Sequence, residues 1–173
     1  ALRRLPVAAT PGLRLPGSFD GFETAVRCIL GQQVTVAAAR TVTRRLLEAF
    51  GEPLTDAPPG LLRLFPTPQA LASASAEELG RLGIVRQRVA ALQALSRGVA
   101  DGHIDLRPAA PLEPTLQALA GLRGIGDWTA QLIAMRVLGW PDAFPATDIG
   151  VLNALATRDL PQVRALAETW RPW

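Results

Sequence analysis

Residues 122–148 read LRGIGDWTAQLIAMRVLGWPDAFPATD, and this stretch decides the fold expected for the chain. Gly124 and Gly126 bracket one apolar residue, Ile125, between two segments of helix-forming sequence. Because glycine adopts φ > 0 without a Cβ penalty, the chain can reverse within a few residues and begin a new helix at once. The stretch therefore predicts a helix-hairpin-helix over about residues 114–138.

The predicted turn is suited to binding a phosphate group. The first amides of a helix have no intrahelical partner, and the helix dipole adds partial positive charge at the same place. The turn and the first residues of the second helix supply such amides, at Gly124, Ile125, Gly126 and Thr129. We expect a nucleic-acid backbone to bind there without help from a charged side chain.

Capping signals and apolar periodicity predict helices over most of the remaining chain. The signals are Asp20 with Glu23, Thr67 before Pro68, and Ser75 with Glu78. The predicted helices span residues 20–30, 35–50, 67–83 (as two short helices), 85–99, 114–122, 128–138 and 161–170. We expect residues 52–66 to form a loop with at most one helical turn, at 61–64. Since no run of useful length alternates as a strand does, the fold class is all-α.

Four stretches of the chain carry a family resemblance. They are PGLRLPGSFDGFETAVRCILGQQVTVAAA from residue 11, FPTPQALA from residue 65, LRGIGDWTA from residue 122, and PATD ending at Asp148. In this order they resemble the helix-hairpin-helix Gly-Pro-Asp superfamily of DNA glycosylases, on its 3-methyladenine DNA glycosylase II branch. The resemblance implies two helical lobes flanking a DNA-binding cleft. Residues 20–143 would form the central lobe, and residues 1–19 with 144–173 a second, incomplete lobe of a longer chain.

Asp148 stands where this family has its catalytic aspartate. Cleavage of an N-glycosidic bond passes through an oxocarbenium-like sugar, which a carboxylate stabilises while it orients or deprotonates a water. Ordinary glycosidases need a second carboxyl group as an acid. A purine alkylated at N3 or N7 is already positively charged, so one aspartate suffices. The alternative is that Asp148 only caps a helix. One helix and a return loop separate it from the hairpin, and this spacing favours the catalytic interpretation.

The resemblance also implies the residues around the damaged base. Trp128 occupies the position of the lysine of lyase-type members, where an indole would stack on a flipped cationic base; the alternative is a core tryptophan. Leu132 and Ile149 replace tyrosines, which predicts a less aromatic base pocket. Gln33 replaces a leucine wedge that fills the gap left by the flipped base, unless it is only a polar residue of an interhelical turn.

No cofactor is expected for catalysis. The resemblance implies one structural monovalent cation, bound by the backbone carbonyls of Ala120, Leu122 and Ile125. The single histidine, His103, has too few neighbouring ligand types for a metal site, and the single cysteine, Cys28, is expected in the core.

The composition restricts the chemistry further. All 18 basic residues are arginines, the formal net charge is +3, and no lysine is present for a Schiff base. No apolar run reaches the ~18 residues of a membrane span, and no signal peptide is evident. The composition thus predicts a protein without membrane contact. The resemblance implies in addition a cytoplasmic, nucleoid-associated bacterial monomer that binds double-stranded DNA containing damaged bases.

These observations predict a monofunctional DNA glycosylase that excises alkylated purines in base excision repair. The alternative from another class is a non-catalytic DNA-binding module, a fragment or degenerate copy that keeps the hairpin. A bifunctional glycosylase/lyase is disfavoured because the chain lacks both a lysine and a cysteine cluster.

Overall fold

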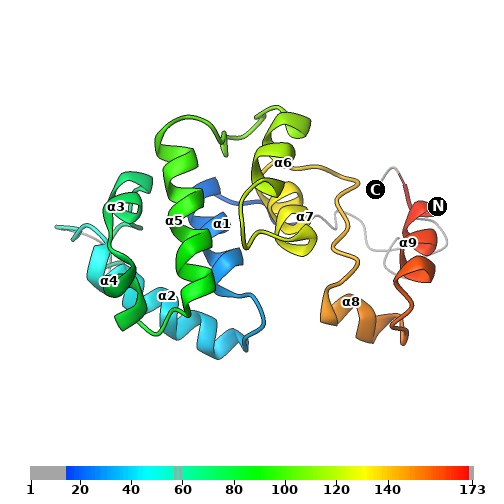
Figure 1. Ribbon diagram of the computed structural model, residues 1–173, viewed down its shortest axis with the longest axis horizontal. Coiled ribbons are helices and arrows are strands. Elements are labelled where there is room, and N and C mark those ends of the chain that lie inside the picture. The colour runs from blue at the N-terminus through cyan, green and yellow to red at the C-terminus, as the bar shows by residue number, and fades with distance from the viewer. Residues whose placement is uncertain (1–14, 57, 59, 172–173) are drawn as a thin grey trace.

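The computed structural model describes residues 15–56, 58 and 60–171, and this part of the chain is helical (Figure 1). Its helices are α1 Gly21–Leu30, α2 Val36–Phe50, α3 Pro68–Ser73, α4 Ala76–Arg81, α5 Arg86–Ala100, α6 Leu112–Ala120, α7 Asp127–Arg136, α8 Ile149–Ala154 and α9 Leu160–Glu168. Within the described ranges the only pairing of extended backbone is one isolated bridge. The predicted all-α class is confirmed. The same residues contain no helix both long and apolar enough to cross a membrane.

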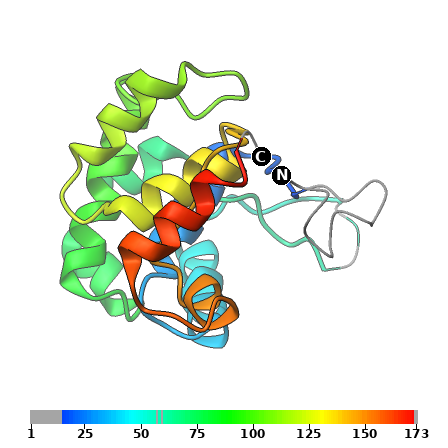
Figure 2. The same cartoon turned by 90° about the vertical axis from the view of Figure 1, so that its right-hand side faces the viewer.

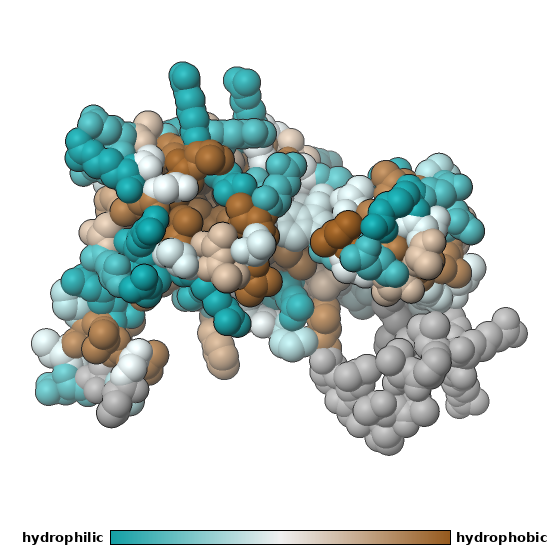
Figure 3. Space-filling view, turned by 90° about the horizontal axis from the view of Figure 1, so that it is seen from below, coloured by the Kyte–Doolittle hydropathy of each residue, from teal (hydrophilic) through white to brown (hydrophobic). Residues whose placement is uncertain are grey.

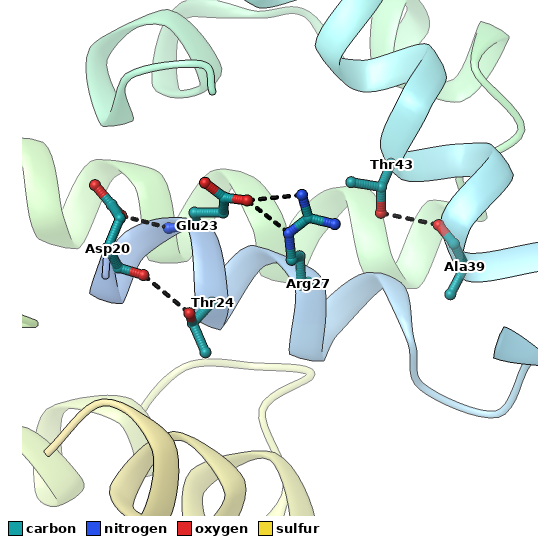
Figure 4. Close-up of polar contacts among 6 residues, drawn as sticks. All are labelled: Asp20, Glu23, Thr24, Arg27, Ala39 and Thr43. Carbon is teal, nitrogen blue, oxygen red and sulfur yellow. Dashed lines mark hydrogen bonds and ion pairs between the residues drawn. The ribbon is translucent and has the colours of Figure 1, made fainter. Parts of the chain in front are cut away.

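Polar side chains fix where the helices begin. At α1, the Asp20 carboxylate accepts the Glu23 amide at 2.7 Å, and the Thr24 hydroxyl donates to the Asp20 carbonyl at 2.9 Å (Figure 4). The Glu23 side chain pairs instead with the Arg27 guanidinium, with Oε1 2.6 Å from Nη2. The pair at α1 is therefore a one-sided cap, whereas the box predicted at Ser75, before α4, is formed in both directions.

The larger hydrophobic cluster is built around α5. Helix α3 packs on one side of α5 and α1 on another, and α1 in turn packs on α7 (Figure 1). Leu92 of α5, Ile29 of α1 and Ile133 of α7 are fully buried in this cluster. Burial of this kind stabilises by roughly 25 cal/mol per Å² of apolar surface. The hairpin of α6 and α7 is thus anchored to the main body through the buried face of α7.

The described part of residues 52–66 is a loop, as predicted. It contains no helical turn at 61–64, and Pro53 and Arg63 form an antiparallel bridge that was not predicted. The Leu54 amide donates to the Leu62 carbonyl at 3.0 Å, and the Leu64 amide donates to the Glu52 carbonyl at 2.8 Å. These bonds use backbone groups that a helical turn would have needed, which explains why the loop contains no helix.

The loop closed by this bridge projects from the body of the molecule (Figure 2). Its returning segment carries three exposed leucines, Leu61, Leu62 and Leu64. In the space-filling view from below it is a separate protrusion with hydrophobic surface at the lower left (Figure 3). The loop lies at the opposite end of the molecule from α8 and α9 (Figure 1).

A second, smaller hydrophobic cluster joins α8 and α9. Its buried members are Ala146, Leu152 and Val163. Phe144, which packs against them, meets the Trp170 ring edge-to-face, with 5.7 Å between the ring centroids. The division into residues 20–143 and residues 1–19 with 144–173 stays a prediction. Residues 1–14, which belong to the proposed second lobe, lie outside the described part.

Candidate active site and nucleic-acid interface

The two glycines of the hairpin turn have different environments. Gly124 has φ +93°, and a Cβ added there would lie 2.9 Å from the Ala91 Cβ of α5. Gly126 has φ −90°, and no heavy atom comes within 4 Å of its added Cβ. Only Gly124 is therefore required by the turn and its packing. Gly126 instead leaves open space in front of the N-terminus of α7, where a phosphate can approach.

The backbone amides at this N-terminus are only partly in use. The Ala130 amide donates to the Gly126 carbonyl at 3.0 Å and closes the first turn of α7. The amides of Gly126 and Thr129 donate to no acceptor among the described residues, whereas the Ile125 amide donates to the Leu122 carbonyl at 3.0 Å. Of the expected phosphate donors, Ile125 is thus already bonded, and its side chain is buried in the larger cluster.

Asp148 makes two kinds of contact at once. Its Oδ1 accepts the Gly150 amide at 2.8 Å and the Val151 amide at 3.3 Å, so it caps α8. Its Oδ2 accepts the indole Nε1–H of Trp128 at 2.7 Å. Three N–H groups thus donate to this one carboxylate. The two alternatives for Asp148 are therefore compatible, because capping uses one oxygen and leaves the other facing α7.

A groove of about 940 Å³ collects most of the expected site residues. Three segments form its walls, namely the connection between α1 and α2, the hairpin turn, and the start of α8. The residues expected from sequence that line it are Gln33, Gly124, Ile125, Gly126, Trp128, Thr129, Asp148 and Ile149. Segments more than 100 residues apart in the chain, at Gln33 and Asp148, thus face the same space.

Leu132 does not line this groove. It lies one helical turn after Trp128, where its side chain packs against the larger hydrophobic cluster. Residues four apart lie on the same face of a helix, so Leu132 follows Trp128 along that face but contacts the hydrophobic cluster and not the groove. Ile149 does line the groove, but its side chain is 62% exposed, so it encloses little of the space.

The side chains of two glutamines form hydrogen bonds between the segments around the groove, and the sequence analysis predicted neither. Gln32 Nε2 donates to the Gly124 carbonyl at 3.0 Å and to the Thr129 hydroxyl at 2.9 Å. Gln131 Oε1 accepts the Phe144 amide at 3.0 Å, which fastens the segment leading to Asp148 onto α7. No local signal distinguishes such a glutamine from a solvent-exposed one, because its partners are set by tertiary packing. Thr129 is 2% exposed and its hydroxyl accepts Gln32 Nε2, so the exposed Gly126 is the more accessible of the expected phosphate donors.

The carbonyls expected to bind a cation are compatible with that role. The Leu122 carbonyl accepts one bond, from the Ile125 amide, and a carbonyl oxygen has a second lone pair. Elsewhere in the described ranges no group of three or more His, Cys, Asp or Glu side chains could bind a metal ion. His103 is exposed. Burial raises the pKa of the Cys28 thiol to about 11, so this side chain stays a neutral core group at physiological pH.

Comparison with known proteins agrees with this geometry. The family model described as "HhH-GPD superfamily base excision DNA repair protein" matches residues 26–164. The chain is 41% identical over 175 residues to DNA-3-methyladenine glycosylase 2 of Escherichia coli (strain K12), an alignment that covers 100% of this chain and 60% of that protein. The chain therefore spans less than two thirds of the length of this relative.

Solved structures share the fold. A 3-methyladenine DNA-glycosylase from Archaeoglobus fulgidus superposes with a TM-score of 0.72 at 24% identity, over 90% of this chain and 55% of that one. The apo-form of an 8-oxoguanine glycosylase/lyase from Clostridium acetobutylicum superposes with a TM-score of 0.78 at 19% identity, over 98% and 63%. The match of the family model and the 41% identity show that this chain belongs to the HhH-GPD superfamily of base excision DNA repair proteins.

Proposed function

We propose that this chain is the catalytic region of a monofunctional DNA glycosylase, which hydrolyses the N-glycosidic bond of alkylated purines of the 3-methyladenine type. The observation that carries the proposal is the placement of Asp148. Its carboxylate lies on the wall of a groove whose other walls are the hairpin turn and the Gln33 loop. A glycosylase needs this combination of an anion, a backbone-binding turn and a space for an extruded base.

Different walls of the groove bind different parts of the DNA. The open amides at the start of α7 bind a backbone phosphate, which positions the duplex without reading its sequence. A flipped base enters the groove beside Trp128, whose indole is held by its bond to Asp148. A cationic purine is attracted to an aromatic face, so this site favours alkylated over neutral bases.

Asp148 acts on the sugar. The Asp148 anion stabilises the positive charge that develops as the base leaves, and it orients or deprotonates the attacking water. The alkylated base departs with its own positive charge neutralised by the bonding electrons, so no general acid is required. Trp128 keeps the carboxylate in place during the reaction through Nε1–H.

The product is an intact abasic strand. Trp128 stands at the lysine position of lyase-type relatives, and the chain has no lysine elsewhere. A Schiff base at the sugar is therefore excluded except through the terminal α-amine. Borohydride should trap no covalent adduct with an N-terminally blocked protein. Strand cleavage together with a trapped adduct would show that another nucleophile attacks the sugar.

The remaining features of the proposal concern binding partners. The partner is double-stranded DNA with damaged bases, bound by a monomer in the bacterial cytoplasm at the nucleoid. A monovalent cation on the carbonyls of Ala120, Leu122 and Ile125 would stabilise the turn, and no cofactor takes part in the reaction.

One experiment tests the proposal against the alternative of a non-catalytic DNA-binding module. The purified chain is incubated with duplexes containing 3-methyladenine, 7-methylguanine, hypoxanthine or ethenoadenine, and abasic sites are revealed by alkali. We expect release of the cationic bases first. Asp148→Asn is the matched control, because it still caps α8 but carries no charge; it should lose roughly 10²-fold or more in rate. Binding without base release, or equal release by Asp148→Asn, would reject the proposed mechanism.

A further inference from the structure

Gln32 connects two segments that are distant in the chain. Its Nε2 uses both hydrogens, one on the Gly124 carbonyl at 3.0 Å and one on the Thr129 hydroxyl at 2.9 Å. Gly124 is the left-handed residue of the hairpin turn, and Thr129 is a buried residue in the first turn of α7. Both partners thus belong to the most constrained part of the proposed phosphate site.

Gln33, the next residue, has the opposite character. It is exposed, it lines the groove, and it has φ +50°. A residue with a side chain keeps this left-handed conformation only where its surroundings impose it. Gln32 fixes the chain on one side. On the other, the Thr35 hydroxyl accepts the Ala38 amide at 3.2 Å and begins α2. Gln33 is thus presented to the groove by neighbours that are bonded to the rest of the fold.

We infer that Gln32 is a positioning residue that joins the Gln33 loop and the hairpin into one DNA-binding unit. Backbone binding at the hairpin then places Gln33 beside the flipped nucleotide, and the two interactions are energetically coupled. The inference rests on the proposed function for the role of Gln33. The inference adds that the contribution of the Gln33 loop to DNA binding depends on its bonds to the hairpin turn.

The structure supplies a matched control for this role. Gln93 of α5 also donates from Nε2 to a distant carbonyl, that of Ala74, at 2.7 Å in a partly buried position. Gln93 does not line the groove. A purely structural role for Gln32 predicts that Gln32→Leu and Gln93→Leu have the same kind of effect, a loss of thermal stability with no change in how Gln33 acts.

The experiment is a double-mutant cycle on a duplex with a tetrahydrofuran abasic-site analogue, read by fluorescence anisotropy. Gln33→Ala should weaken binding about tenfold in the wild-type background. In the Gln32→Leu background the same change should cost less than about twofold, whereas in the Gln93→Leu background it should still cost about tenfold. Equal costs of Gln33→Ala in all three backgrounds, or no cost in the wild type, would overturn the inference.

Two further variants keep the test valid if Gln32→Leu fails to fold. Gln32→Glu keeps the length of the side chain but cannot donate, and Thr129→Val removes one acceptor; both should uncouple Gln33. Thr129→Ser keeps the hydroxyl and should restore coupling. Because the readout is binding to an abasic analogue, coupling without base excision would reject the proposed reaction alone. Excision without coupling would reject the inference alone, and absence of binding would reject both.

Discussion

The two hydrophobic clusters of the molecule place functional groups in different ways. The larger cluster draws on α1 to α7 and holds the hairpin by burial of residues such as Ile133. The smaller cluster has only Ala146, Leu152 and Val163 as buried members, yet it supports the helix that begins at Asp148. Nonpolar packing therefore anchors the hairpin, where we propose that a phosphate binds, while a hydrogen bond from Trp128 of α7 holds the Asp148 carboxylate. The site therefore depends on the position of Asp148 relative to the hairpin turn.

Core truncations should separate the two clusters most clearly. Leu92→Ala in the larger cluster should lower the free energy of unfolding by about 2 to 5 kcal/mol, because it leaves a cavity in a fully buried site. Val163→Ala should cost about 2 kcal/mol and should reduce base release more than Leu92→Ala does at equal folded fraction. Urea unfolding and single-turnover excision measure the two quantities. Wild-type excision by Val163→Ala would show that α9 does not support Asp148.

Trp128→Phe tests the direct bond between the two regions. Phenylalanine keeps an aromatic face for the base but cannot donate to Asp148 Oδ2. A hydrogen bond to a charged group contributes about 1.5 to 3 kcal/mol, which corresponds to roughly 10- to 100-fold in rate. We expect the loss in kcat with little change in binding to abasic DNA. If binding falls and kcat is kept, Trp128 serves the base pocket and does not position the carboxylate.

The two glycines of the hairpin provide an internal comparison within the packed region. Gly124→Ala should destabilise the fold by about 1 to 3 kcal/mol, because alanine meets both a positive φ and the Ala91 side chain. Gly126→Val should leave thermal stability nearly unchanged and weaken binding to every DNA sequence alike. Thermal unfolding and anisotropy at several salt concentrations distinguish the two. Unchanged affinity of Gly126→Val would mean that the hairpin does not bind the backbone.

Gln131 should have the smallest effect of the four. Gln131→Leu removes the acceptor for the Phe144 amide and should lower excision a few-fold, since one neutral hydrogen bond contributes about 1 kcal/mol. Gln131→Glu keeps an acceptor oxygen and should retain most of the activity. Equal losses of excision in both variants would mean that the hydrogen bond to the Phe144 amide is not the cause. The cause would then be a change in α7 or in the charge at residue 131.

Local sequence signals were sufficient to predict the helices and the hairpin turn. Caps at Asp20, Thr67 and Ser75 depend on residues three or four positions away, and the structure forms all three. The bridge of Pro53 with Arg63 was missed, because a proline-rich stretch shows no alternation that would predict pairing. Asp148 was predicted to be catalytic, with a helix cap as the alternative; the structure shows the cap, and the catalytic role stays a prediction that this geometry allows.

The missed parts of the site depend on contacts across the fold. Gln32 bonds to residues 92 and 97 positions away, and nothing near it in sequence encodes that distance. Leu132 was assigned to the base pocket by its position in the family. Its side chain packs against the larger hydrophobic cluster and does not line the groove, and its assignment to the base pocket stays a prediction. The sequence identified most of the residues that line the groove but not the glutamines behind them, and the chemistry of the groove stays a prediction.

The bridge between Pro53 and Arg63 also bears on how the protein tolerates added sequence. Because this pair closes the projecting loop, the ends of any insertion at residues 54–62 stay fixed close together. Doubling the length of such a loop costs only about 0.6 kcal/mol in chain-closure entropy. The loop lies away from α7 and α8 (Figure 1). It is therefore a site where an affinity peptide or a fluorophore can be inserted without disturbing the groove.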